Sequence, residues 1–182
     1  NRIPPGLPNS ITELDLSFNI ISKINKGDFE FLTNLESLTM ANCELSSVDE
    51  RALDPLYGLT KLDLSFNVFK TFPKSAFSRC VRASLVRFDF SNNNELACDC
   101  NALWLREWMA DRPLLFTDND RKVSDLPDLY KCITTKWNRN ITSKEELSIY
   151  DLNNSPCGTR VSICNLNRKM CGFTKYDPTY CK

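Results

Sequence analysis

Apolar residues recur along the first half of the chain in one pattern, in which a leading apolar residue precedes two apolar positions that stand two residues apart. Segments with this pattern start at Ile11, Leu35, Leu59 and Leu85, so the first three are spaced by 24 residues and the last step is 26. The central apolar pairs are Leu14 and Leu16, Leu38 and Met40, Leu62 and Leu64, and Phe88 and Phe90. Residues two apart in a strand point to the same face, so each pair predicts a short strand with one apolar face.

Four such segments predict a solenoid, because no single repeat can bury its apolar face alone and parallel stacking gives each strand a neighbour. Asn19, Asn67 and Asn93 follow the strands, where we expect a buried side-chain amide to bond backbone groups of the adjoining turns, and Cys43 takes this place in the second segment. Apolar residues between the strands are expected on the returning convex side: Phe29, Leu32, Leu53, Leu56, Phe77 and Cys80.

The stretch NELACDCNALWLREWM, residues 94–109, begins where the fourth repeat stops. The last repeat of a solenoid must be covered, and the spacing predicts a helix whose covering face carries Leu103, Trp104, Trp108 and Met109. Cys98 and Cys100 stand one residue apart, which is a poor spacing for two ligands of one zinc ion and differs from the CxxC of redox sites. Structural disulfides are therefore the favoured interpretation of this pair.

Each repeat matches LxxLxLxxNxL, the leucine-rich repeat signature, and NxxLxCDCxxxWLxxW resembles the cysteine-rich C-terminal cap of extracellular leucine-rich repeat proteins. The resemblance implies an α/β-type horseshoe solenoid with a short parallel sheet and a disulfide-bonded cap, with bonds from Cys98 to Cys132 and from Cys100 to Cys157. The opening NRIPPGLPN looks like the last part of an N-terminal cap, so we expect that cap to be truncated and the first repeat to carry an apolar edge. The expected organisation is the end of an N-terminal cap (1–10), four repeats (11–93), the C-terminal cap (94–157) and a cysteine-containing basic tail (158–182).

The phrases LPNSITELDLSFNIISKI and LTMANCELSSVDERALDPL most resemble the opening repeats of Toll-like receptor ectodomains. This resemblance implies a non-enzymatic, extracellular recognition module of innate immunity that needs no cofactor. Its partner would be a protein or microbial ligand, bound on the concave face or the cap, and binding would be coupled to receptor dimerisation. The alternative is a complete short secreted leucine-rich repeat protein, acting as an antigen-binding receptor, a decoy, or an adhesion or guidance ligand.

Composition agrees with an extracellular setting. Nine cysteines in 182 residues, most of them after residue 97, indicate an oxidising compartment, and the sequons at Asn140 and Asn153 predict glycosylation there. The charge is balanced at 23 basic and 23 acidic residues, which disfavours nucleic acid as a partner, and no apolar run approaches the ~20 residues that membrane insertion needs. The chain has no histidine, so histidine-based catalysis and the commonest zinc ligand are excluded; neither an active site nor a metal site is expected.

The remaining candidate for function is the concave surface, formed by strand residues that point away from the core. An acidic row, interrupted by a threonine, is expected beside a basic edge, and these positions are the candidate ligand-binding residues: Glu13, Asp15, Thr39, Lys61, Asp63, Arg87 and Asp89. The same side chains are also what an ordinary solvated surface would carry, and the sequence leaves both interpretations open.

The tail adds Cys164, Cys171 and Cys181 beyond the cap and carries five basic residues against one acidic residue. It is either a small disulfide-stapled extension or a basic element that binds a partner or dimerises. Seven cysteines lie between residues 98 and 181 and cannot all pair with one another. Either one of them is free, one bonds another chain, or Cys80 is paired.

Overall fold

A computed structural model describes residues 2–98, 100–117, 122–138 and 141–149 of the chain. Nine of the elements precede residue 112 and build the repeats and the first cap helix: β1 (Glu13–Asp15), β2 (Lys23–Ile24), β3 (Ser37–Thr39), β4 (Ser47–Val48), β5 (Lys61–Asp63), η1 (Lys74–Ala76), α1 (Arg79–Ser84), β6 (Arg87–Asp89) and α2 (Cys100–Asp111). The others complete the cap: η2 (Pro113–Phe116), η3 (Val123–Asp125), α3 (Leu126–Leu129), β7 (Lys131–Asn138) and β8 (Ile141–Ser148).

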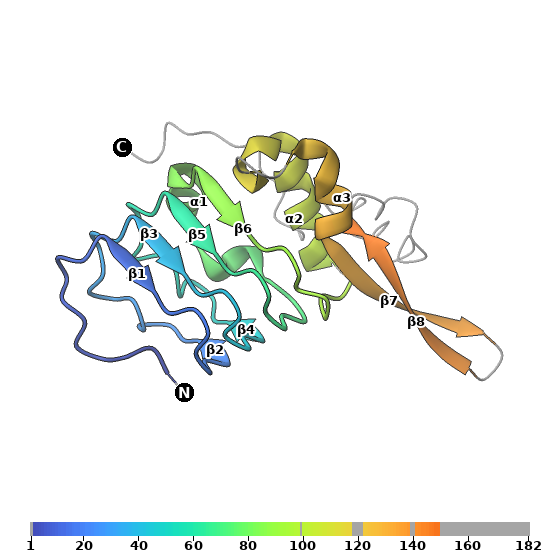
Figure 1. The fold of residues 1–182 in the computed structure, drawn as a ribbon, viewed down its shortest axis with the longest axis horizontal. Helices are drawn as coiled ribbons and strands as arrows, with labels where there is room; N and C mark the ends of the chain where they lie inside the picture. Colours follow the sequence, from blue (N-terminus) through green and yellow to red (C-terminus); the bar gives the residue numbers. More distant parts are fainter. Residues whose placement is uncertain (1, 99, 118–121, 139–140, 150–182) are drawn as a thin grey trace.

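The four predicted strands form one parallel sheet in the order β1-β3-β5-β6 (Figure 1). The register places the central apolar residues of the repeats side by side, with Leu14 opposite Leu38, Leu38 opposite Leu62, and Leu62 opposite Phe88. A second parallel sheet, β2-β4, follows the turns of the first two repeats and was not predicted from the sequence. The first two repeats therefore stack in register at two places along the chain.

The core lies between the sheet and the convex side, as the apolar pattern predicts. Phe29, Leu53 and Leu56 of the convex segments are fully buried, and Phe77 is 1% exposed. Cys80, also expected on the convex side, is half-buried and disulfide-bonded, which is one of the alternatives that the sequence left open.

The asparagine after each strand bonds the preceding repeat where such a repeat exists. The Asn67 amide donates to the carbonyl of Met40, and its oxygen accepts from the N–H groups of Cys43 and Leu45 at 2.9 and 3.0 Å. Asn19 was wrongly predicted to be buried: it is exposed and donates only to carbonyls of its own turn, because the described residues place no repeat before the first one. Position along the solenoid therefore decides what the same residue does.

Cys43 holds the asparagine position of the second repeat as a buried free thiol. Its S–H donates to the carbonyl of Leu16 at 3.0 Å and to that of Ala41 at 3.6 Å, and burial raises the pKa of the thiol. A thiol has no oxygen to accept from the first repeat as the Asn67 amide does, and the N–H of Ile21 donates to the Cys43 backbone carbonyl instead. At this position the first and second repeats therefore lack the side-chain acceptor that Asn67 supplies between the second and third.

Helix α2 covers the end of the fourth repeat, as predicted. The Trp104 indole N–H donates to the carbonyl of Phe72 at 2.8 Å, and the ring stacks on Phe72 and on Trp108. The helix is more deeply buried than a single covering face implies, since Ala102 and Leu105 are buried as well as Leu103, Trp104 and Met109, whereas Trp108 is only partly buried. The core turns from aliphatic to aromatic at this end of the solenoid.

The cap also takes over the backbone bonds that a fifth repeat would make. The N–H of Leu64 donates to the carbonyl of Asp89, but the equivalent N–H of Phe90 points to the hydroxyl of Tyr130 at 3.5 Å. The N–H of Asn92 donates to the carbonyl of Leu129 at 3.3 Å. On the convex side, Arg112 donates to two carbonyls at the end of α1, those of Arg82 and Leu85, at 2.9 and 2.8 Å.

A disulfide joins Cys98 to Cys132, the pairing that the resemblance implies. The two segments are already neighbours, because the N–H of Cys98 donates to the carbonyl of Ile133 at 3.0 Å and the N–H of Ile133 donates to that of Leu96 at 2.6 Å. Beyond this point β7 and β8 form an antiparallel hairpin that extends away from the solenoid (Figure 1). The bond therefore fixes the base of the hairpin to the end of the last repeat.

Candidate recognition surface

The sheet register brings the predicted concave residues together in two rows. Asp15, Thr39, Asp63 and Asp89 lie side by side on successive strands, and so do Glu13, Ser37, Lys61 and Arg87. Adjacent strands are about 4.8 Å apart, so neighbours in a row are within reach of one ligand group. The first row is acidic apart from its threonine, and the second changes from acidic to basic towards the cap.

The acidic row has a structural role that the sequence pattern did not reveal. In each case one carboxylate oxygen accepts from the N–H two residues later, at 2.9 Å, in the pairs Asp15 and Ser17, Asp63 and Ser65, and Asp89 and Ser91. These contacts turn the chain out of the strand. Hydrogen bonds from Ser17 also hold the pKa of Asp15 below its usual value. The acidic row therefore also helps to end the strands.

The predicted ligand-binding residues differ in how far their side chains are exposed to solvent. Lys61 and Arg87 are exposed and Asp63 is half-buried, so all three can meet a partner. Asp89 is only 6% exposed, because η2 of the cap packs against β6, and a small part of it borders the concave hollow. The accessible concave surface therefore ends at Arg87.

A shallow hollow of about 170 Å³ lies over β3, β5 and β6, lined by Thr39, Lys61, Asp63, Arg87 and their neighbours. Small-molecule sites usually enclose about 300–1,000 Å³ in largely apolar walls, so this charged hollow suits side chains of a macromolecular partner better. In the described part of the chain, no three histidine, cysteine, aspartate or glutamate residues are grouped so that they could hold a metal ion.

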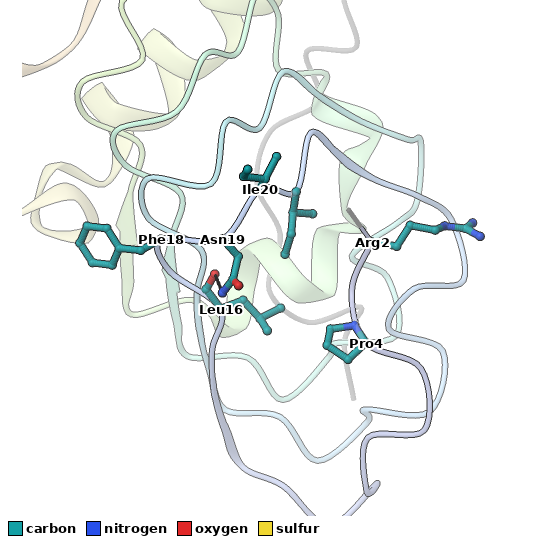
Figure 2. A pocket seen from close by; sticks show the side chains of 7 residues that line it. Arg2, Pro4, Leu16, Phe18, Asn19 and Ile20 are labelled. Carbon is teal, nitrogen blue, oxygen red and sulfur yellow. Dashed lines mark hydrogen bonds between the residues drawn. The ribbon is translucent and has the colours of Figure 1, made fainter.

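A larger hollow of about 530 Å³ lies at the open end of the solenoid, beside the first repeat. Figure 2 shows Leu16, Asn19 and Pro4 around it, with Phe18 turned outward. The first repeat was predicted to carry an apolar edge, but its core residues Leu16 and Ile21 are only 8% and 3% exposed, and Leu14 is partly buried. The exposed Phe18 and Phe66 were not among the predicted site residues, although both occur in an SFN segment, in the first and third repeats.

Several predicted residues lie outside what the structure describes. These are the glycosylation sites Asn140 and Asn153, the cysteines Cys157, Cys164, Cys171 and Cys181, and the side chain of Cys100. Cys80, however, is disulfide-bonded, and its partner is none of Cys43, Cys98 and Cys132. Of the alternatives left open by the odd cysteine count, this one is therefore realised. With Cys43 free, the remaining eight cysteines are an even number.

No helix within the described ranges combines the length and the apolar character that crossing a membrane requires.

Comparison with known proteins gives a family match and several partial relatives. Residues 9–69 match a family model described as leucine rich repeat. The zebrafish (Danio rerio) leucine-rich repeat-containing protein 3 is 36% identical over 101 residues, which is 54% of this chain and 36% of that protein. Human (Homo sapiens) Toll-like receptor 8 is 37% identical over 79 residues, 40% of this chain and 8% of the receptor. Mouse (Mus musculus) epiphycan is 36% identical over 93 residues, 51% of this chain and 27% of that protein.

The chain thus spans about a third or less of the length of these relatives. The matched segment coincides with the first three repeats, and the parallel register continues the same arrangement to Asp89. Through residues 9–69, therefore, the chain is similar to the leucine-rich repeat family.

Proposed function

We propose that this chain is an extracellular recognition module of the kind found in Toll-like receptor ectodomains, which binds a protein or microbial ligand and dimerises on binding. The observation that carries the proposal is the pair Lys61 and Arg87, exposed and adjacent in register beside the carboxylate of Asp63. The similarity to a Toll-like receptor and the Cys98–Cys132 disulfide support the extracellular setting.

The size of the sheet limits how it can bind. Four strands at about 4.8 Å spacing make a surface about 19 Å wide. A standard protein interface covers about 800 Å² on each partner, so contact with the strands alone is too small. The exposed surface of the cap, which directly follows β6, is the natural extension of the contact.

The proposal is tested by surface plasmon resonance with the whole chain immobilised. The analytes are purified receptor ectodomains, bacterial lipopolysaccharide and bacterial lipopeptide. For any analyte that binds, the double variant Lys61→Glu and Arg87→Glu should weaken binding by at least about tenfold, because charge at the centre of a contact is reversed. Lys26→Glu is the matched control, since Lys26 is equally charged and exposed but lies after β2, outside the concave sheet.

Dimerisation is tested separately by sedimentation velocity with and without that analyte. A shift from monomer to dimer only in the presence of analyte supports the proposal. Binding that is indifferent to Lys61 and Arg87, or a sedimentation coefficient unchanged at saturation, contradicts it.

A short secreted recognition protein is the second candidate, because epiphycan matches the chain as well as the Toll-like receptor does. The two candidates differ in the parent transcript. The receptor proposal predicts that it encodes further repeats or a membrane span, whereas the secreted alternative predicts a short coding region.

A further inference from the structure

Four apolar side chains line one rim of the solenoid, directly after the concave strands. We call Phe18, Ile20, Phe66 and Val68 the rim surface; their side chains are 81%, 59%, 56% and 42% exposed. Single exposed apolar residues are ordinary. These four occupy the same two positions of the first and third repeats, so they form a regular surface instead of a scatter.

The backbone makes the two phenylalanines unfavourable choices for stability. Residues 18, 42, 66 and 92 all have φ between 55° and 59°, in the left-handed region. Asparagine tolerates this conformation and occupies two of the four positions, Asn42 and Asn92, whereas a bulky side chain there is an outlier. Phe18 and Phe66 thus combine a disfavoured backbone with an exposed ring, and such outliers gather at functional sites.

The hydrogen-bond ladder fixes how the two rings are spaced. The N–H of Phe18 donates to the carbonyl of Ala41 at 3.0 Å, that of Asn42 to Ser65 at 3.1 Å, and that of Phe66 to Ser91 at 3.0 Å. The repeats therefore stack in register here also. Two strand spacings place the Phe18 and Phe66 backbones about 10 Å apart, with the small side chain of Asn42 between them. Phe18 and Phe66 therefore stand two repeats apart, on either side of the exposed Asn42.

The charged residues near the rim surface indicate which charge a partner should carry. The rim segments 17–20, 41–44 and 65–68 contain one charged residue, the exposed Glu44, and no lysine or arginine. Asp15 and Asp63 stand just before the rim on their strands. Aromatic faces attract cations, and this attraction adds to that of the carboxylates.

We propose that the rim surface binds a segment of a partner protein in which an apolar side chain is flanked by lysine or arginine. The apolar side chain packs over Asn42, between Phe18 and Phe66, and the basic residues meet Glu44, Asp15 and the aromatic faces. This contact differs from the concave one in its aromatic anchors and in the sign of the charge that carries it, and Asp15 and Asp63 border both surfaces.

The test is selection of a random peptide phage library on the whole chain, followed by fluorescence polarisation with the selected synthetic peptides. The expected consensus is a central apolar residue flanked by lysine or arginine. The double variant Phe18→Asn and Phe66→Asn should bind these peptides at least about tenfold more weakly, because both aromatic anchors are removed. Its thermal midpoint should equal or exceed that of the parent chain, since asparagine suits the left-handed backbone.

Two control variants make the result specific. Phe31→Asn removes a phenylalanine that is 73% exposed away from the rim, and it should leave the affinity unchanged. Lys61→Glu with Arg87→Glu should also leave peptide binding intact, which separates this proposal from the concave one.

Three outcomes overturn the inference. One is the absence of any enriched peptide whose binding depends on Phe18 and Phe66. Another is an acidic or purely apolar consensus. The third is dimerisation of the chain alone in sedimentation velocity that the double variant abolishes, because the occupant would then be a second copy.

Discussion

The first and the fourth repeat differ in how their outer sides are covered. At the far end, α2 and Tyr130 close the fourth repeat, so that Phe88 is fully buried and the N–H of Phe90 meets a hydroxyl. At the first repeat, Asn19 is exposed and a hollow of about 530 Å³ lies beside Leu16. Each repeat is stabilised by its contacts with the adjacent repeats. We therefore expect the repeats next to the cap to unfold less readily than the first repeat. The difference teaches that equivalent residues in the repeats have unequal energetic weight.

The strongest test of this contrast replaces the central aromatic of the cap. Trp104→Ala should lower the free energy of unfolding by about 3–5 kcal/mol, because it empties a buried site and orphans the carbonyl of Phe72. Phe31→Ala at the open end removes a residue that is 73% exposed and should change it by no more than about 0.5 kcal/mol. Urea unfolding followed by circular dichroism measures both. Similar losses at the two sites would show that the ends do not differ in this way.

The disulfide provides the next test of the sealed end. Replacing Cys98 and Cys132 together by serine should destabilise the chain by about 4 kcal/mol, which is the chain-entropy value for a closed loop of this length. The sequence separation of the two cysteines is 34 residues. The double replacement avoids leaving an unpaired thiol that could exchange with other disulfides.

Hydrogen exchange shows where that loss falls. If the bond secures the cap, protection should decrease most at the amides of Phe90 and Asn92, which bond cap residues, and least at those of the first repeat. A uniform decrease along the whole solenoid would mean that the cap and the repeats unfold as one unit.

A third comparison uses the same residue type at an inner and at the end position. Asn67→Ala should cost about 3 kcal/mol, because the backbone N–H groups of Cys43 and Leu45 lose their acceptor inside the core. Asn19→Ala should cost about 0.5 kcal/mol, since the Asn19 side chain is exposed and only bonds carbonyls of its own turn. Parallel urea titrations of the two variants measure the gap, and equal costs would contradict the idea that position outweighs residue type.

The sequence predicted what depends on local repetition and missed what depends on distant partners. The fixed step located the parallel strands, and the apolar spacing identified Leu38, Leu62 and Phe88 as neighbours in the core. It was wrong for Asn19, because the rule assumes a preceding repeat. It also gave no sign of Tyr130, whose hydroxyl meets a backbone group forty residues earlier.

The recognition surface was predictable in the same uneven way. Rows of side chains follow from register, so the repeat spacing alone predicts that Lys61 and Arg87 are neighbours. Burial of Asp89 depends on how the cap packs over β6, and the disulfide of Cys80 depends on a pairing that no local pattern encodes. The left-handed backbone at Phe18 and Phe66 follows from the geometry of the turn, and the repeat signature gives no information on it.

The smallest expected effect comes from restoring the asparagine that the second repeat lacks. Cys43→Asn should stabilise the chain by about 1 kcal/mol, since an amide can donate to the carbonyl of Leu16 as the thiol does and can also accept from the first repeat, as Asn67 does from the second. Asparagine already fits this position in the third and fourth repeats, so the core has room for it. Cys43→Ala is the control and should destabilise by about 1 kcal/mol, because it removes the donor and supplies nothing in return. The decisive measurement is hydrogen exchange at the Ile21 amide. Slower exchange in the asparagine variant would show that the second repeat stabilises the first. Unchanged exchange would mean that the side chain at position 43 does not limit local opening of the first repeat.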